Sequence, residues 1–329
     1  MQDYKKILND FLPDRLFDAH SHPYDSSFMK SIYPPERKPE RFDYDDYQRD
    51  MREQLGIERD FMLNMITFPD KKMADLSNGS LAASDLFLKE QLEKDPRNVG
   101  EILTLCDESA EHIASRLGHP QIRGLKCYHY MNPAEKTFGL NVGDYLSEAA
   151  WEVANEKHMF ITLHMVKQDA LADEDNLRYI REHAKRYPDA VLILAHAARS
   201  FASWTGVESV EKVADLDNVW FDFGAVCESP AIYRIMQKTG TKRCMWGTDY
   251  PISNWIGKAI SLGSGFYWLY NDGMDRLGDV DALVPERWSV AVECLMAVRQ
   301  ACILADLSDD AVEDVFFNNA DNLFHKICR

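Results

Sequence analysis

Four segments of the chain end in side chains that could bind a metal ion or move a proton. One contains His20 and His22 in the sequence Phe-Asp-Ala-His-Ser-His. Apolar runs also precede His164 and His196, and the run Met-Trp-Gly-Thr-Asp ends at Asp249. Imidazole nitrogens and carboxylate oxygens are ligands of zinc and similar divalent ions, and both groups can act as general acids or bases. The sequence therefore contains the groups for a metal site with acid–base chemistry.

The His-x-His pair points to a metal site on geometric grounds. Side chains alternate along a strand with a period of two, so His20 and His22 should point to the same side. Two imidazoles placed in this way suit a divalent ion. Each group also has a simpler interpretation, since a histidine can be a hydrogen-bonded core residue and Asp249 can cap a helix. The shared location at the ends of four apolar runs favours one common site.

Short apolar runs alternate with charged, amphipathic stretches, a pattern typical of βα units around a parallel sheet. Two of these stretches predict helices over Val142–Lys157 and Asp175–Tyr187. The predicted strands are Arg15–His20, Phe61–Thr67, Glu101–Cys106, Arg123–Cys127, Met159–His164, Val191–His196, Val219–Gly224 and Arg243–Asp249. Eight strands close a (β/α)₈ TIM barrel. An open doubly wound sheet is disfavoured because no Gly-x-Gly-x-x-Gly follows an early strand. We expect one α/β barrel domain over residues 1–329.

Two segments between the predicted elements are longer than ordinary loops. Pro23–Asp43 follows the first strand, and Pro251–Glu286 follows the eighth. Both leave from the carboxyl ends of strands, where barrel enzymes build their active sites. The second segment is rich in aromatic residues, namely Trp255, Phe266, Tyr267, Trp268 and Tyr270. We expect it to cover the mouth of the barrel; the alternative is that these rings extend the core at the rim.

The whole barrel resembles the amidohydrolase superfamily, in particular its amidohydrolase-related branch of metal-dependent TIM-barrel enzymes. The motifs that carry the resemblance are Asp18-Ala-His-Ser-His22, Arg123-Gly-Leu-Lys126, His164, His196-Ala-Ala-Arg199, Trp246-Gly-Thr-Asp-Tyr-Pro251 and Asn318-Asn-Ala-Asp-Asn-Leu-Phe324. The resemblance implies that His20, His22, His164 and Asp249 bind one divalent metal, with zinc expected and manganese as the alternative. It also implies that His196 either polarises the substrate or binds a second metal.

Three further residues, Lys126, Arg199 and Asp18, belong to the motifs near this site. In two-metal members of the superfamily a lysine like Lys126 is carboxylated and bridges the ions, whereas many one-metal members keep it unmodified. We expect an unmodified Lys126 that binds a substrate carboxylate as a point charge. Arg199 could bind an anionic substrate through two hydrogen bonds, or it could be a surface residue. Asp18 lies two residues before His20 and is expected to face the same way; it could orient a ligand histidine, or its position could be a coincidence of the strand register.

The favoured function is hydrolysis of a small, acidic, carbonyl-containing molecule such as an amide or lactone. A metal ion lowers the pKa of its bound water to about 7. Asp249 would accept the proton of the water, and His196 would stabilise the carbonyl oxygen. The alternative is a metal-dependent, non-hydrolytic decarboxylase of an aromatic or dienoic acid, which would use the same ligands. A barrel that binds but no longer catalyses is disfavoured because all four ligands are present.

Composition limits the remaining function classes. The formal net charge of −17 argues against binding to nucleic acid or anionic lipid. The seven cysteines include no Cys-x-x-Cys pair, so we expect buried, reduced thiols. Residues 1–10 do not resemble a signal peptide, and no apolar run approaches the roughly 20 residues of a membrane span. We expect a cytoplasmic protein that binds a small molecule, with assembly into a homo-oligomer left open.

Overall fold

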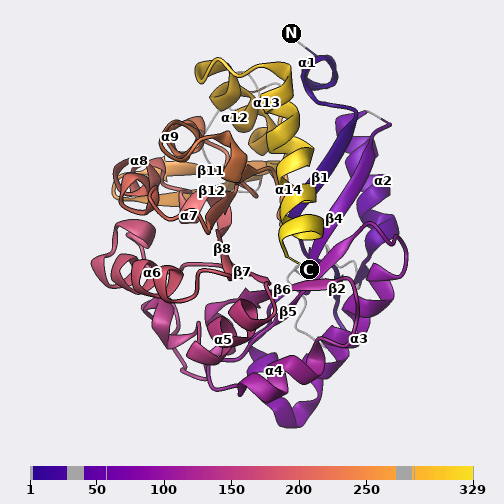
Figure 1. The fold of residues 1–329 in the computed structure, drawn as a ribbon. Coiled ribbons are helices and arrows are strands. Elements are labelled where there is room, and N and C mark those ends of the chain that lie inside the picture. Colours follow the sequence, from indigo (N-terminus) through magenta and orange to yellow (C-terminus); the bar gives the residue numbers. More distant parts are fainter. Residues whose placement is uncertain (1–2, 28–40, 57, 272–283, 285, 329) are drawn as a thin grey trace.

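Eight parallel strands form the centre of the molecule, and helices surround them (Figure 1). The computed structural model describes residues 3–27, 41–56, 58–271, 284 and 286–328. In order around the sheet the strands are β1 (Arg15–Ser21), β4 (Asp60–Ile66), β5 (Val99–Leu103), β6 (Ile122–Cys127), β7 (Phe160–Leu163), β8 (Val191–Leu194), β9 (Val219–Asp222) and β10 (Cys244–Met245). The sequence order of the strands equals their spatial order, as in a TIM barrel. The predicted fold is confirmed.

The barrel closes where the residues after β10 meet β1. The Ala19 N–H donates to the Trp246 carbonyl oxygen at 3.0 Å, and the Asp249 N–H donates to the His20 carbonyl oxygen at 2.7 Å. The segment that carries Asp249 is therefore held by its backbone against the strand that carries His20. Closure of the barrel and assembly of the site use the same contacts.

The helices begin and end largely where capping residues allow. They are α1 (Tyr4–Phe11), α2 (Tyr44–Leu55), α3 (Ser80–Leu92), α4 (Ala110–Arg116), α5 (Glu148–Glu156), α6 (Glu174–Arg186), α7 (Ala195–Arg199), α8 (Ser203–Ser209), α9 (Ser229–Thr239), α12 (Val290–Leu304), α13 (Asp309–Glu313) and α14 (Asn319–Asn322). The helix predicted over Val142–Lys157 is shorter than expected. Ser147 accepts a hydrogen bond from the Ala150 N–H, so it caps α5 and starts the helix there.

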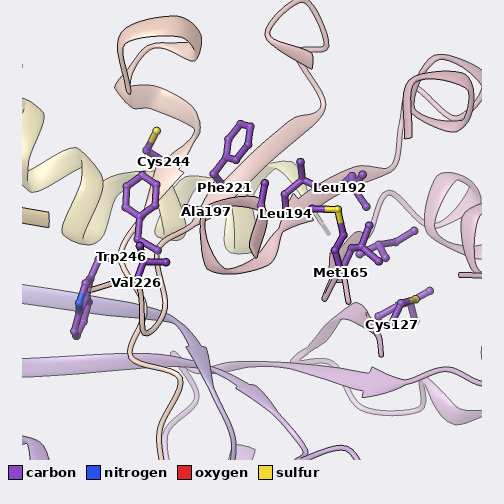
Figure 2. Close-up of a cluster of buried hydrophobic side chains, with 14 of the residues drawn as sticks. Cys127, Met165, Leu192, Leu194, Ala197, Phe221, Val226, Cys244 and Trp246 are labelled. Atoms are coloured by element: carbon purple, nitrogen blue, oxygen red, sulfur yellow. The ribbon is translucent and has the colours of Figure 1, made fainter. Parts of the chain in front are cut away.

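Side chains of the strands alternate between two hydrophobic clusters. The outer layer lies between the strands and the helices and includes Leu16, Leu63, Leu192, Leu194 and Phe221. Figure 2 shows part of it. The inner cluster fills the barrel and comprises Phe17, Ala19, Met62, Val99, Phe160, Val191, Ile193, Trp220, Met245, Phe317, Ala320, Leu323, Phe324 and Cys328. The last five of these come from the C-terminal helical segment, so that segment packs against the strand starts and leaves the opposite end of the barrel for the site.

Several of the observed strands are shorter than predicted, at the positions where polar groups begin. β7 ends before His164, β8 ends before His196, and β10 ends before Asp249. At His196 and Asp249 the backbone has positive φ values of 57° and 63°, which a strand cannot accommodate. These side chains therefore project from the short segments that follow the strands, and not from the strands themselves.

Two smaller hairpin pairings lie outside the barrel sheet. β2 (Tyr24–Asp25) pairs with β3 (Arg41–Phe42), and β11 (Gly257–Leu262) pairs with β12 (Gly265–Tyr270). Of the two long segments predicted after the first and eighth strands, residues 28–40, 272–283 and 285 lie outside the described residues. In the described part of the chain, no helix is long and apolar enough to cross a membrane. All seven cysteines are free thiols and six of them are buried, as expected.

Candidate metal centre and cavity

A bulge in β1 turns His20 toward the barrel interior. The pairing of β1 with β4 places Asp18 opposite Leu63 and Ser21 opposite Met65, so three steps along β1 match two along β4. Leu63 and Met65 belong to the outer layer. Asp18 and Ser21 therefore lie on the outer side, and the bulge lets the intervening His20 face inward.

The expectation that Asp18 faces the same way as His20 is wrong, because the bulge separates them. The Asp18 carboxylate accepts hydrogen bonds from the Tyr47 hydroxyl of α2 at 2.8 Å and from the Thr248 hydroxyl at 2.5 Å. It also accepts from the backbone N–H groups of His20 and Thr248, both at 2.9 Å. Asp18 thus fixes the backbone beside His20 and Asp249, and it does not contact either ring.

The hydrogen bonds of His20 and His22 fix their tautomers. Nδ1 of His20 lies 3.0 Å from the Asp222 carboxylate, and Nδ1 of His22 lies 2.9 Å from the carbonyl oxygen of Ile66. Both partners can only accept, so each Nδ1 carries the hydrogen and each Nε2 presents a lone pair. Burial is the main cause that lowers the pKa of both rings, to about 3 at His20. Neutral imidazoles are the form that binds metal ions.

Three lone-pair atoms converge at this point. The two Nε2 atoms are 3.1 Å apart, and Oδ1 of Asp249 lies 3.2 Å from Nε2 of His22 and 3.7 Å from Nε2 of His20. Acceptors at such distances repel each other unless a cation lies among them. Burial alone would raise the pKa of Asp249, but the surrounding histidines hold this pKa below its usual value. The donor set fits a divalent ion such as zinc.

His164 and His196 form a second pair beside the first. Nδ1 of His196 donates to the Gly224 carbonyl oxygen at 2.8 Å, and its Nε2 lies 3.1 Å from Nδ1 of His164. The rings of His20 and His196 have centroids 4.7 Å apart. Among the described residues, the ligand atoms of His20, His22 and Asp249 lie within 4.8 Å of one another, and His164 is outside this group. The structure therefore brings three of the four predicted ligands together and links the fourth through His196.

Asp222 is a functional candidate that the sequence analysis missed. It is fully buried, and besides His20 it accepts the backbone N–H of His196 at 3.2 Å. Burial would raise its pKa, but His20, His196 and Lys126 together hold the pKa of this carboxyl well below its usual value. Asp222 also joins His20 and His196 in a second group of possible ligands. Its position at the end of a predicted strand was the available signal.

Lys126 lies inside the barrel, beneath the histidines. Its Nζ is 3.1 Å from Nε2 of His20, and its side chain is fully buried. Burial lowers the pKa of Lys126, while Glu101, Asp222 and Asp249 oppose that shift. Glu101 is a second residue that the sequence analysis missed; burial raises its pKa to about 7. The ammonium group of Lys126 therefore faces several carboxyl groups and the proposed metal ligand His20. It does not face open solvent.

A cavity of about 260 Å³ opens above these residues. Its polar lining consists of His22, His164, His196, Arg199 and Asp249. Its aromatic lining consists of Phe68, Tyr128, Phe138, Phe201, Phe266, Trp268 and Tyr270. Such a combination, an apolar wall with a few convergent polar groups, is typical of a small-molecule site. Lys126 does not line the cavity.

Arg199 is a cation without an acidic partner in the described part of the chain. Its guanidinium lies 5.1 Å from the centroid of the Phe266 ring, and one Nη donates to the Lys167 carbonyl oxygen at 3.3 Å. Its Nε is buried without a hydrogen-bond partner among the described residues. Burial lowers the pKa of Arg199. The side chain is thus available to an anion in the cavity.

The β11–β12 hairpin supplies one wall of the cavity through Phe266, Trp268 and Tyr270. In the described part of the segment that was predicted to cover the mouth, these three rings line the cavity and also pack against a small hydrophobic cluster. The hairpin is tied down at its end, where Glu228 accepts the Ser261 N–H at 2.8 Å and the Ser261 hydroxyl at 2.6 Å. Aromatic rings that line a cavity in this way shape what enters it.

Comparison with known proteins identifies relatives of this barrel. The family model described as "Amidohydrolase" matches residues 17–326. No curated protein sequence matches the chain. An amidohydrolase from Burkholderia multivorans with bound zinc has a TM-score of 0.57 at 11% identity, over 94% of this chain and 99% of that one.

Two further solved structures share the fold and differ in their reactions. A protein assigned as a 2-pyrone-4,6-dicarboxylic acid hydrolase from Pseudomonas putida has a TM-score of 0.57 at 14% identity, over 95% of this chain and 98% of that one. The 5-carboxyvanillate decarboxylase from Novosphingobium aromaticivorans, with manganese and a nitrobenzoic acid, has a TM-score of 0.55 at 14% identity. It covers 95% of this chain and 96% of its own.

Proposed function

The chain belongs to the amidohydrolase family, and from this premise we propose that it hydrolyses a small, acidic carbonyl compound such as an amide or a lactone. The observation that carries the proposal is the convergence of Nε2 of His20, Nε2 of His22 and Oδ1 of Asp249 beneath a cavity. Three acceptor atoms that face one another in this way form a place for a cation, next to the Lys126 Nζ that lies 3.1 Å from Nε2 of His20.

We assign His20, His22, His164 and Asp249 as ligands of one divalent ion. His164 completes the set if its ring turns from His196, 3.1 Å away, toward the other three groups. Zinc suits three imidazoles and one carboxylate. Manganese is the alternative, and the two neighbours that contain these metals show that the fold accommodates both.

The ion would supply Lewis acidity, which polarises a substrate carbonyl and acidifies water. Asp249 is ionised and lines the cavity, so its carboxylate can accept a proton from the attacking water and return it to the leaving group. His196 faces the same cavity, and its Nδ1 hydrogen is already donated to the Gly224 carbonyl oxygen, so its Nε2 would stabilise the oxygen on which charge develops as the N–H donor of a protonated ring. Asp222 holds the backbone of His196 and the ring of His20, which keeps both in place.

Lys126 stays unmodified in this proposal. Glu101, Asp222 and Asp249 all favour the positively charged form of its side chain. Carboxylation would replace that cation by a further anion beside three carboxyl groups, which electrostatics disfavours. A single metal per chain follows. Because Lys126 lies below the cavity, its role as a partner of a substrate carboxylate requires the substrate to reach His20, and we assign substrate binding to Arg199 first.

The cavity favours a planar, anionic substrate. Arg199 offers at one side a cation that has no carboxylate partner in the described part of the chain, and aromatic rings such as Phe266 and Trp268 supply flat walls. A carboxylate can accept two hydrogen bonds from a guanidinium, which both orients the substrate and compensates the buried charge.

Decarboxylation of an aromatic acid is the second candidate. Arg199, which has no acidic partner among the described residues, and the aromatic walls favour it, because a ring carboxylate could be held there while a second group approaches the metal ligands. One structural neighbour is a decarboxylase and another is assigned as a hydrolase, so both reactions occur on this fold. The ligand set is common to the two.

Turnover in isotopically labelled water distinguishes the two reactions. Purified protein loaded with zinc or manganese is incubated with a panel of lactones, amides and aromatic acids in H₂¹⁸O, and separately in D₂O. Label in a product carboxylate supports hydrolysis. Release of carbon dioxide, with deuterium at the vacated carbon, supports decarboxylation and contradicts the proposed order. The matched inactive control is Asp249→Asn.

A further inference from the structure

Residues His196 to Arg199, which lie within the segment labelled α7, form a left-handed turn after β8 in place of a regular α-helix. The φ and ψ angles are 57° and 48° at His196, 52° and 47° at Ala197, and 59° and 41° at Ala198. At Arg199 φ is 60°. The Ser200 N–H donates to the His196 carbonyl oxygen at 2.8 Å, which closes the turn. Each of these residues has a Cβ, which crowds the following carbonyl oxygen in this conformation, so consecutive non-glycine residues rarely adopt it.

The alternation of side chains along β8 shows how the turn changes the direction of His196. Val191 and Ile193 belong to the inner cluster, whereas Leu192 and Leu194 belong to the outer layer. If the strand continued with its period of two, residue 196 would point outward with residues 192 and 194. His196 instead lines the cavity. The left-handed turn therefore reverses the direction that the strand would have given this side chain.

The two residues in the middle of the turn take the outward positions. Ala197 and Ala198 are fully buried and belong to the outer layer. Figure 2 shows Ala197 beside Leu192 and Leu194 in that cluster. Arg199, three residues after His196, lines the cavity again. The turn thus places the first and fourth side chains at the cavity and the second and third in the core.

We propose that the left-handed turn His196–Arg199 is a positioning element, which brings His196 to the metal ligands and sets Arg199 beside it as the anion-binding group. Ala197 and Ala198 are the positioning residues, because each must accept a positive φ and remain small enough for the outer layer. The inference rests on the proposed roles of His196 and Arg199. It adds that these roles depend on the backbone conformation of the two alanines between them.

Valine and glycine at these positions separate the effect of conformation from that of packing. Valine is β-branched and strongly disfavours a positive φ, so Ala197→Val or Ala198→Val should force the turn open. Glycine accepts a positive φ without strain, so Ala197→Gly and Ala198→Gly should keep it. The control Ala170→Val makes the same change at another fully buried alanine, whose φ is 46° and which does not line the cavity.

The readouts are the affinity of the zinc-loaded protein for isophthalate, measured by calorimetry, and the melting temperature. Isophthalate is a planar dicarboxylate, so it tests Arg199 and the aromatic walls without any turnover. We expect both valine variants at the turn to weaken binding by about tenfold or more, the usual effect of losing a charge-assisted hydrogen bond. The glycine variants and Ala170→Val should bind within about twofold of the unmodified protein.

Several outcomes would overturn the inference. They are unchanged affinity in both valine variants at the turn, an equal loss in Ala170→Val, or failure of the unmodified protein to bind isophthalate. If the valine variants do not fold, the glycine variants decide: affinity retained at an unchanged or higher melting temperature supports the inference, and weakened affinity contradicts it. Isophthalate binding without turnover of any tested acid would count against the proposed reaction and leave this inference standing.

Discussion

Asp222 accepts a hydrogen bond from Nδ1 of His20 at 3.0 Å, deep inside the barrel. The same carboxylate accepts the backbone N–H of His196 at 3.2 Å through its other oxygen. One side chain therefore sets the tautomer of a proposed metal ligand and the backbone position of a proposed catalytic group.

Asp222→Asn should weaken metal binding. An asparagine amide can donate as well as accept, so it no longer enforces a hydrogen on Nδ1 of His20, and the negative charge beside the ring is lost. Outer partners of ligand histidines typically contribute about 10–100-fold in metal affinity. Competition with a chromophoric zinc chelator measures this. The exposed Asp217→Asn is the control, and equal affinity in the two variants would refute the role of Asp222.

Asp249→Asn should remove turnover while the fold remains. The residue follows β10 at the catalytic end of the barrel, where substitutions affect chemistry more than stability. We expect kcat to fall by about 10²–10⁴-fold, the usual contribution of a general acid–base group. Circular dichroism melting checks the fold. A variant that retains full activity after chelation and dialysis would show that this carboxylate neither binds metal nor moves protons.

Metal analysis should give one ion per chain, with Lys126 unmodified. The carboxyl groups of Glu101, Asp222 and Asp249 favour the ammonium form of this lysine. Elemental analysis gives the stoichiometry, and intact-protein mass spectrometry under mild conditions with and without bicarbonate detects a carboxylated lysine. Two ions per chain together with a bicarbonate-dependent mass increase would contradict the expectation.

Glu228→Gln should loosen the β11–β12 hairpin. Glu228 is a charged acceptor for the Ser261 N–H, the Ser261 hydroxyl and the Ser203 hydroxyl. Hydrogen bonds to a charged group each contribute about 1.5–3 kcal/mol in buried settings, and partial exposure reduces this. We expect a severalfold higher KM and faster hydrogen exchange in residues 257–270. Glu211→Gln, at an exposed ion pair with Arg234, is the control; the same KM in both variants would argue against the hairpin's role.

Glu101→Gln should reduce the loss of stability as the pH rises from about 5 to about 7. Burial raises the pKa of Glu101 from 4.5 to about 7. Its contribution to folding is thus fully present below pH 4.5 and is lost as the pH rises through about 7, because the buried side chain must then ionise. Without this ionisable group, the melting temperature should decline less between pH 5 and pH 8. The corresponding difference in the free energy of unfolding is up to about 3 kcal/mol. If the melting temperatures of the Glu101→Gln variant and the unmodified protein depended on pH in the same way, this prediction would be refuted.

Period-two and apolar patterns were enough to predict the eight strands and the end of the barrel that carries the site. The polar residues at strand ends were predicted for the same reason, since parallel strands bring their carboxyl ends together. What the pattern could not show are departures from regular geometry. The bulge after Asp18 and the left-handed turn at His196 each reverse the side to which a residue points. Both depend on contacts with segments far away in the sequence.

Asp222 and Glu101 were not predicted as site residues, for a different reason. Each is a single carboxylate within an otherwise apolar strand, and a lone acidic residue has no spacing that marks it. Only the three-dimensional structure shows that both face the same interior as Lys126. The expected pairing of Arg199 with a substrate stays a prediction, although the structure places the side chain at the cavity.

The way in which the barrel closes has a consequence for the order of events during synthesis. A nascent chain presents His20 and His22 early, but the segment that pairs with β1 and carries Asp249 emerges only after the other strands. The inner cluster is then completed by Phe317 and Phe324, which emerge later still. Until that point an early-bound ion would have an incomplete coordination shell and could be lost to competing chelators. Stable loading therefore requires that the segment carrying Asp249 has paired with β1, and metal retention would report whether the barrel has closed.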